Sequence, residues 1–241
     1  MLRVFPDVSS LARAAGDLFV ARVDRSADPS AFRVALAGGE TPEELYRLLA
    51  ANPYRHRIGW ERVHLFWGDE RCVPPQDARS NERMACQALI DHVPVPPEQV
   101  HPIRCAGSAQ HAAREYGRLL QSLFGSQGPT FDLVLLGLGE DGHTASLFPG
   151  SRSLLETQEL AVATRGGDPD LPRVTLTAPV INRSECVIFL VSGHGKANAL
   201  QAVLEGSPDP SRWPAQLIRP QAGDLFWLVD QAAASLLQKF P

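Results

Sequence analysis

Asp141 and His143 are the residues of this sequence with the clearest capacity for acid–base chemistry. They lie in the segment 131–149, where a continuously apolar run leads into a glycine-rich turn. Open α/β folds place their ligand sites at the carboxyl ends of strands. Histidine is also the side chain whose ordinary pKa suits proton transfer near neutrality. We therefore predict a reactive site at this turn, with a carboxylate and an imidazole at the edge of a sheet.

The same turn also matches a dinucleotide-binding pattern. Gly137, Gly139 and Gly142 satisfy the spacing GxGxxG after an apolar strand. That fingerprint should open a long helix in the first βαβ unit of a fold. Here Pro149 leaves room for barely two helical turns, and other predicted strands precede this one. The glycines are better explained as shaping a turn that presents the carboxylate and the imidazole.

A second candidate segment, ALAGGETP, follows the first predicted strand. Gly38 and Gly39 allow a ligand to approach the backbone closely, and Thr41 can cap the helix that follows. A helix amino terminus behind two glycines can bind an anion through its unpaired N–H groups and the helix dipole. A tight turn that binds nothing is the alternative. The carboxylate of Glu40 would repel a phosphate unless it points away.

Charged residues form two further candidates. Asp69, Glu70 and Arg71 follow the second predicted strand, where they could be a solvated turn or could supply a carboxylate and a guanidinium to a polar substrate. Arg173 and Lys196 stand at the start of a strand and of a helix. Each could be ordinary surface charge, but together they could hold a phosphate.

The elements that must position these residues alternate along the chain. Runs rich in Val, Leu, Ile and Phe predict strands over 33–37, 63–67, 131–136, 173–177, 186–191 and 224–229. Apolar periodicity predicts helices over 42–50, 109–124 with Ser108 as N-cap, 196–204 and 231–240. This alternation predicts an α/β fold with a mostly parallel, doubly wound sheet and helices on both faces. Since no linker is visible, we expect one domain over residues 1–241.

The amino-acid composition limits the kinds of partner that this protein could bind. The formal net charge of −4 and the absence of a polybasic tract argue against nucleic acid and lipid surfaces. No run approaches the roughly 18 apolar residues that a membrane helix needs. Pro6 and Asp7 stand where a signal peptide would have its apolar stretch. We expect a cytoplasmic protein.

The cysteines point the same way. Cys72, Cys86, Cys105 and Cys186 are far apart, with neither a CxxC pair nor a zinc-type spacing. We therefore expect reduced, mostly buried thiols rather than a metal site or a disulfide.

Five segments, taken in order, resemble the 6-phosphogluconolactonase family. They are AGGETP, WGDERCVP with a downstream SN, LGLGEDGHTASLFPG, PRVTLTAPVIN and SGHGKANAL. The resemblance covers nearly the whole chain, and it is the ordered set that makes it specific. It implies the fold shared by glucosamine-6-phosphate deaminase and ribose-5-phosphate isomerase. It also implies hydrolysis of 6-phospho-D-glucono-1,5-lactone to 6-phospho-D-gluconate in the oxidative pentose phosphate pathway, without metal or cofactor.

The resemblance also implies roles for the candidate residues. His143 would be the general base that takes a proton from the attacking water, and Asp141 would orient or polarise the site. Asp69 and Arg71 would contact the sugar or the developing oxyanion.

The phosphate would rest on the turn from Gly38 through Gly39 to Thr41, together with Arg173 and Lys196. This chain has Glu40 where the family commonly has serine. Contact between that side chain and the phosphate is therefore left open.

Two other functions stay open. A deaminase of the same superfamily also has a GGTP-type turn and an Asp-Gly-His segment, but it carries a glutamate where this chain has Phe148, and Asp-Glu-Tyr rather than Asp-Glu-Arg at 69–71. A sugar-phosphate sensor should come with a DNA-binding module, for which we see neither length nor a basic segment. The expected partner is a small sugar-phosphate lactone, and a monomer and a small homo-oligomer are equally compatible with the sequence.

Overall fold

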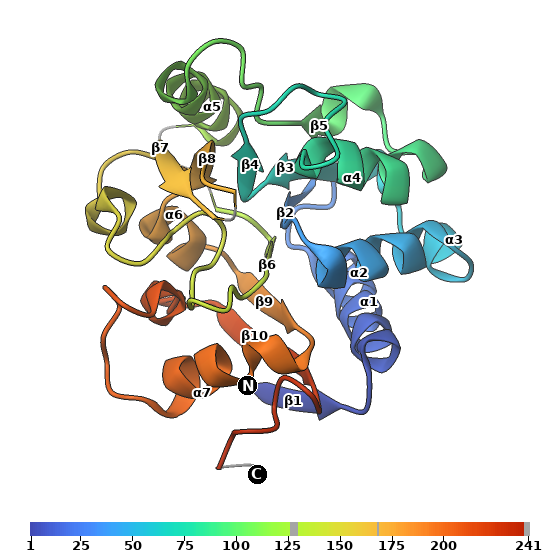
Figure 1. Cartoon of the computed structure of the whole chain (residues 1–241). Helices are drawn as coiled ribbons and strands as arrows, with labels where there is room; N and C mark the ends of the chain where they lie inside the picture. Colours follow the sequence, from blue (N-terminus) through green and yellow to red (C-terminus); the bar gives the residue numbers. More distant parts are fainter. Residues whose placement is uncertain (126–129, 168, 239–241) are drawn as a thin grey trace.

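A parallel seven-stranded sheet forms the centre of the computed structural model, which describes residues 1–125, 130–167 and 169–238 (Figure 1). Neighbouring strands are parallel throughout. In spatial order they are β1 (Leu2–Phe5), β10 (Asp224–Asp230), β9 (Cys186–Val191), β6 (Leu133–Leu136), β2 (Phe32–Leu36), β3 (Val63–Trp67) and β5 (Val100–His101). The α/β fold predicted from the alternating pattern is confirmed.

Helices cover both faces of this sheet. Figure 1 shows α1 (Val8–Arg25), α2 (Glu40–Ala50), α3 (Tyr54–Arg57) and α4 (Asn81–Ala88) on one side, and α5 (Ala109–Phe124), α6 (Ala178–Asn182) and α7 (Ala197–Glu205) on the other. Short 3₁₀ turns are η1 (Trp60–Arg62), η2 (Ile90–His92), η3 (Pro97–Gln99), η4 (Arg152–Leu155), η5 (His194–Lys196) and η6 (Pro214–Leu217). Every residue of β6 and β9 is buried, as expected for strands covered on both faces.

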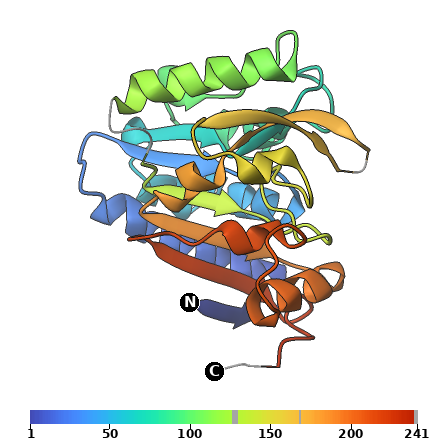
Figure 2. The same cartoon turned by 90° about the vertical axis from the view of Figure 1, so that its left-hand side faces the viewer.

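Helix α5 illustrates how local sequence sets these boundaries. Its bounds are those predicted, and the Ser108 hydroxyl accepts a hydrogen bond from the amide of His111 as an N-cap. Its apolar stripe is buried, including Tyr116 and Leu120, and it packs on a second sheet. In Figure 2 the helix lies at the top, beyond the stacked strands.

This second sheet is small and antiparallel, with the order β4 (Asp69–Arg71), β8 (Leu171–Leu176) and β7 (Ala161–Gly166). The strand predicted over 173–177 therefore exists, but it does not belong to the parallel sheet. Asp69–Arg71 is itself a strand. The chain changes sheets at Gly68, whose amide donates to Leu36 of β2 and whose carbonyl accepts from Leu176 of β8.

Two predicted helix features are wrong. The described part of the segment predicted as a helix over 231–240 forms turns, and residues 239–241 lie outside the described residues. The carboxylate of Asp230 accepts from the amides of Ala233 and Gly193, so it ties the chain after β10 to another loop. Thr41 is not an N-cap, because α2 begins at Glu40 with Gly39 in the capping position.

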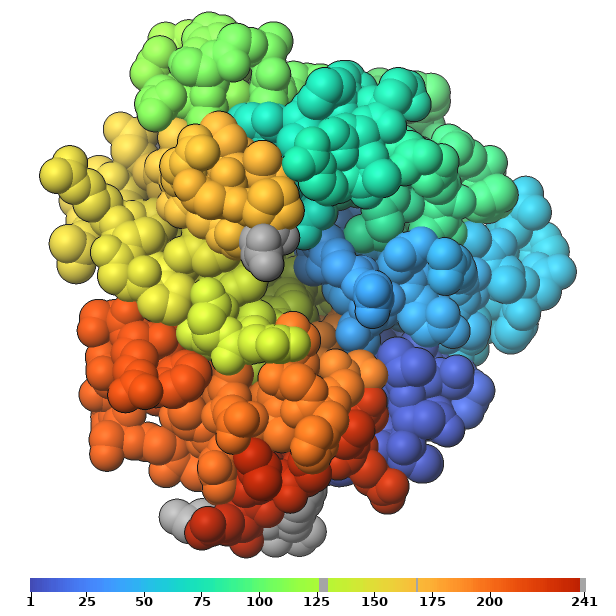
Figure 3. Space-filling view, viewed as in Figure 1, coloured from blue at the N-terminus to red at the C-terminus, as the bar shows by residue number. Residues whose placement is uncertain are grey.

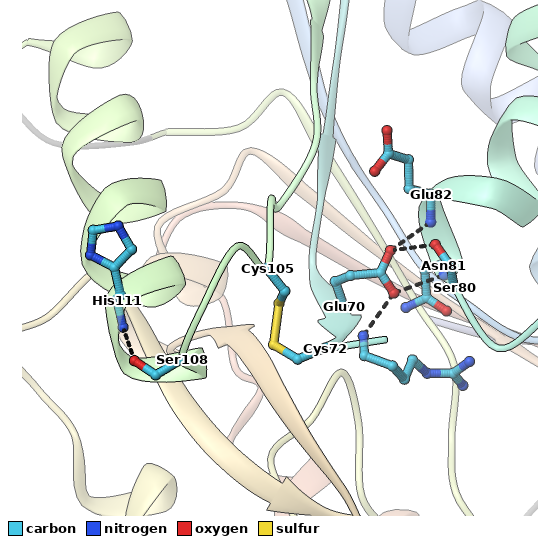
Figure 4. Close-up of a disulfide and its surroundings, with 9 residues drawn as sticks. Glu70, Cys72, Ser80, Asn81, Glu82, Cys105, Ser108 and His111 are labelled. Carbon is cyan, nitrogen blue, oxygen red and sulfur yellow. Dashed lines mark hydrogen bonds between the residues drawn. A yellow bond between two sulfur atoms is a disulfide. The ribbon is translucent and has the colours of Figure 1, made fainter. Parts of the chain in front are cut away.

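The prediction of four reduced thiols is also wrong. Cys72 and Cys105 form a disulfide, with Cα atoms 5.1 Å apart, whereas Cys86 and Cys186 are free (Figure 4). The two residues are 33 positions apart in the sequence, and only the fold brings the end of β4 beside the loop that precedes α5. The cysteines therefore give no support to the expected cytoplasmic location.

Buried apolar side chains of both sheets and of the covering helices form one cluster. The single domain over residues 1–241 stays a prediction. Among the described helices, none combines the length and the apolar character needed to cross a membrane.

Candidate functional site

The predicted residues surround the point where the strand order of the large sheet reverses. From β2 the chain continues to β3 and β5 on one side, and from β6 it continues to β9 and β10 on the other. Ligand sites of open α/β sheets lie at such a point, outside the carboxyl ends of the strands. Figure 3 shows this face hollowed at its centre, between the blue, yellow-green and orange surfaces.

A cavity of about 220 Å³ lies at this point. Among its lining residues are Gly38, Gly39, Asp69, Arg71, His143, Arg173 and Lys196. A second cavity of about 450 Å³ shares the two glycines and the lysine, and it adds Glu40 and Thr41. Of the ten residues that the sequence resemblance places at the site, Asp141 alone lines neither cavity, and it is bonded to His143.

The turn after β6 is shaped so that Asp141 and His143 meet. The imidazole Nδ1 of His143 donates to the Oδ1 atom of Asp141 over 2.5 Å, and the His143 amide donates to the same oxygen. The amide of Gly139 donates to the carbonyl of His143 and closes the turn. A Cβ atom on Gly139 would lie 2.0 Å from the imidazole Nδ1, so only glycine leaves room for the pair.

This pairing fixes the tautomer of the imidazole. Because Nδ1 donates to the carboxylate, Nε2 is left as the acceptor, and the described residues offer it no hydrogen-bond partner. Burial alone would raise the pKa of Asp141, but the hydrogen bonds and charge of His143 outweigh burial and lower it. A carboxylate that accepts a hydrogen bond from Nδ1 of an imidazole is the arrangement that activates a histidine as a base.

Asp69 and Glu70 are buried, so they do not belong to a solvated turn. The Asp69 carboxylate accepts from the Ser146 hydroxyl at 2.5 Å and from the Asn81 side-chain amide at 3.3 Å. It also lies 3.8 Å from Nη1 of Arg173. Each carboxylate oxygen of Asp69 therefore accepts a hydrogen bond beside the cavity.

Glu70 has a structural role at the start of α4. Its carboxylate accepts from the backbone amides of Arg71, Asn81 and Glu82, and Figure 4 shows the bonds to the last two. Burial raises the pKa of this carboxyl to about 7, although the three amides act in the opposite direction. The neighbouring Arg71 side chain reaches the cavity and donates to the carbonyl of Arg79.

Arg173 is buried rather than a surface charge. Its Nε donates to the carbonyl of Gly166 over 2.9 Å, and the Asp69 carboxylate compensates its charge. Lys196 is partly exposed at the end of η5, where its Nζ lies 4.0 Å from a carboxylate oxygen of Glu140. Both cations line the smaller cavity.

The turn after β2 presents backbone rather than side chains to the cavities. Gly39 has a φ of 103°, a conformation that favours glycine, and α2 starts at the next residue. A Cβ atom on Gly38 would lie 2.0 Å from the side chain of Asn81. The side chain of Glu40 is exposed. The turn thus places the amino terminus of an 11-residue helix at the cavities.

Sequence reasoning missed Ser146, Asn81 and Phe148 as parts of the site. Ser146 reaches Asp69 across 77 residues, and no local pattern announces this contact. Asn81 follows Ser80, whose side chain caps α4, so a capping signal could have located it. The aromatic ring of Phe148 lies against both His143 and Arg173.

Comparisons with known proteins bear on the family and the fold of the chain. Residues 6–227 match the sequence model described as glucosamine-6-phosphate isomerases/6-phosphogluconolactonase. A 6-phosphogluconolactonase of Synechocystis sp. is 43% identical over 209 residues, which cover 85% of this chain and 84% of that protein. The structure of 6-phosphogluconolactonase from Trypanosoma brucei has a TM-score of 0.87 and 30% identity, covering 98% of this chain and 97% of that one.

The fold extends to a more distant enzyme. A monomeric glucosamine-6-phosphate deaminase has a TM-score of 0.83 at 22% identity, covering 98% of this chain and 99% of that one. This likeness concerns the fold and confirms the architecture implied by the sequence resemblance. Together with the family match over most of the sequence, these comparisons establish that the chain belongs to the glucosamine-6-phosphate isomerases/6-phosphogluconolactonase family.

Proposed function

We propose that this chain hydrolyses 6-phospho-D-glucono-1,5-lactone to 6-phospho-D-gluconate, with water activated by His143. Curated relatives that are similar over nearly the whole chain carry the name 6-phosphogluconolactonase. The observation that carries the proposal is the His143–Asp141 pair at a cavity that Arg173 and Lys196 also line. One end of such a site suits an ester carbonyl and the other suits a phosphate.

The proposed reaction begins with water in contact with Nε2 of His143. The water oxygen bonds to the lactone carbonyl carbon while Nε2 takes one of its protons, and Asp141 stabilises the resulting imidazolium. The bond between the carbonyl carbon and the ring oxygen then breaks, and the proton passes from Nε2 to that oxygen, which leaves as a hydroxyl. A δ-lactone is an activated ester, so general-base help worth about 10²–10⁴-fold suffices without a covalent nucleophile.

Charged residues near His143 would supply the remaining interactions with the substrate. We assign to Arg71 the donation to the oxyanion that forms on the carbonyl oxygen, a contribution of about 10²–10³-fold for one donor. The phosphate would lie on the N–H groups after Gly39, between Arg173 and Lys196. Because both carboxylate oxygens of Asp69 already accept hydrogen bonds, we assign it the orientation of Arg173 rather than proton transfer.

A hydrolysis assay on freshly made lactone, corrected for spontaneous opening, tests the reaction. His143→Ala should lower kcat by roughly 10²–10⁴-fold with the fold intact. His92→Ala, an exposed histidine in η2, is the matched control and should keep wild-type activity. A wild-type rate for His143→Ala would exclude this histidine as the base.

Arg173→Ala should act mainly on binding. We expect KM to rise roughly 10- to 100-fold, since a hydrogen bond to a charged group contributes about 1.5–3 kcal/mol. Arg165→Ala, an exposed arginine on the neighbouring strand β7, is the control. Unphosphorylated gluconolactone should be a poor substrate for the wild type. Ammonia release from glucosamine 6-phosphate would instead indicate the deaminase reaction.

A further inference from the structure

Phe148 lies between two side chains of the proposed site that act at opposite ends of the substrate. Its ring centroid is 4.7 Å from that of the His143 imidazole, with the planes inclined at 43°. On the other side, the guanidinium carbon of Arg173 lies 5.2 Å from the same ring centroid. Both separations fall within the range of attractive aromatic and cation–π contacts.

The ring is held in place by its surroundings. Phe148 is 6% exposed and follows Leu147, which forms a bridge with Thr144. A Cβ atom on Gly166, the last residue of β7, would lie 2.6 Å from the Phe148 ring. Gly166 therefore provides the space that the ring occupies, and any larger residue there would displace it.

The imidazole and the guanidinium each combine polar contacts with their contact to this ring. Hydrogen bonding holds His143 at one edge, through Nδ1 and Asp141. Arg173 donates from Nε to the carbonyl of Gly166, and its Nη1 faces Asp69. The ring of Phe148 adds to these polar contacts an apolar contact that the imidazole and the guanidinium share.

We propose that Phe148 is a positioning residue that sets the spacing between the imidazole and the guanidinium. This rests on the proposed function, in which the imidazole serves the lactone carbonyl and the guanidinium serves the phosphate. The two ends of the substrate are a fixed distance apart, so loss of the ring disturbs the reacting geometry and the phosphate grip together. An aliphatic side chain fills the volume but offers no flat face to either partner.

Phe148→Leu is the primary test. We expect kcat to fall and KM to rise, each by roughly 10- to 100-fold, as for small misplacements of reacting groups. In an Arg173→Ala background the same change should still lower kcat but should not raise KM further, since the guanidinium is already absent. Phe32→Leu, a buried residue at the amino end of β2, is the matched control and should leave both constants unchanged.

A spectroscopic measurement separates positioning from loss of folded protein. The ring-proton signals of His143 in the NMR spectrum should shift when the aromatic ring beside them is removed. Should Phe148→Leu fail to fold, Gly166→Ala retains the ring but displaces it, and the same kinetic pattern is expected.

Three outcomes would overturn the proposal. In the first, kcat and KM of Phe148→Leu both stay within about twofold of wild type. In the second, the effect on KM persists in the Arg173→Ala background. In the third, the His143 signals do not change. Absence of lactone hydrolysis in the wild type would instead reject the proposed function. The His143 signals would then still show whether the ring of Phe148 contacts the imidazole.

Discussion

Gly139 shows how the smallest residue can control the chemistry of its neighbours. It follows β6 by three positions, and its amide closes the turn that carries Asp141 and His143. The space beside its Cα is filled by the imidazole and the carboxylate themselves. The contact between Asp141 and His143 therefore requires the absence of a side chain at Gly139 as well as the presence of their own side chains.

Replacing this glycine should separate the pair. Gly139→Ala should lower kcat by roughly 100-fold, because the new methyl group displaces the imidazole from its partner. Gly117→Ala in α5 is the matched control, since a Cβ there meets nothing within 4 Å. It should keep wild-type kcat and raise the unfolding free energy by about 0.5–1 kcal/mol. Wild-type kcat for Gly139→Ala would contradict this account of the turn.

At the scale of elements, the strands and helices with a clear apolar pattern were predicted best from the sequence. The strands at Val63–Trp67 and Cys186–Val191 and the helix at Ala109–Phe124 have the bounds expected from the sequence. Asp69–Arg71 was missed as a strand, because three charged residues become a strand only through pairing with β8. Such short strands depend on distant partners rather than on local pattern.

The candidate site could be predicted only where its residues are close together in the sequence or belong to a recognisable motif. Asp141 and His143 lie two positions apart, so a single turn relates them, and ordered motifs located the other segments. Contacts such as Ser146 with Asp69 or Phe148 with Arg173 join segments that the sequence does not relate. The disulfide was missed for the same reason.

That disulfide should stabilise the connection between β4 and the loop before α5. Cys105→Ser should lower the unfolding free energy by about 2–4 kcal/mol in urea titrations, as for removal of disulfides that close loops of similar length. Cys86→Ser, which changes a free thiol, should have a much smaller effect. If a reducing agent leaves the unfolding midpoint of the wild type unchanged, the disulfide does not contribute to stability.

At the scale of the whole molecule, a histidine pair links stability to pH. His64 and His101 stack with ring nitrogens 3.2 Å apart, on the neighbouring strands β3 and β5. Burial, together with the charge of His64, lowers the pKa of His101 to about 4, and burial also lowers the pKa of His64. The folded state therefore takes up protons less readily than the unfolded chain.

This stability should decline as the medium becomes acidic. The contribution of His101 is fully present above its unfolded pKa of about 6.5 and is lost as the pH falls from there towards about 4. We expect His101→Gln to lose less unfolding free energy than the wild type between about pH 7 and about pH 5. Glu70, whose pKa is raised, acts in the opposite direction, but its contribution cancels in the comparison. Equal losses in the two proteins would contradict the prediction.

The cavities lie at the junction of β2 and β6, and their lining residues range along the chain from Ala37 to Lys196. A molecule bound there would contact segments on both sides of that junction and would so connect the two halves of the sheet. Amide hydrogen exchange should then slow in α2 and α7 alike, although the two helices are remote in sequence. Ligand binding would thus stabilise the entire sheet, and the melting temperature of the protein should rise with ligand concentration.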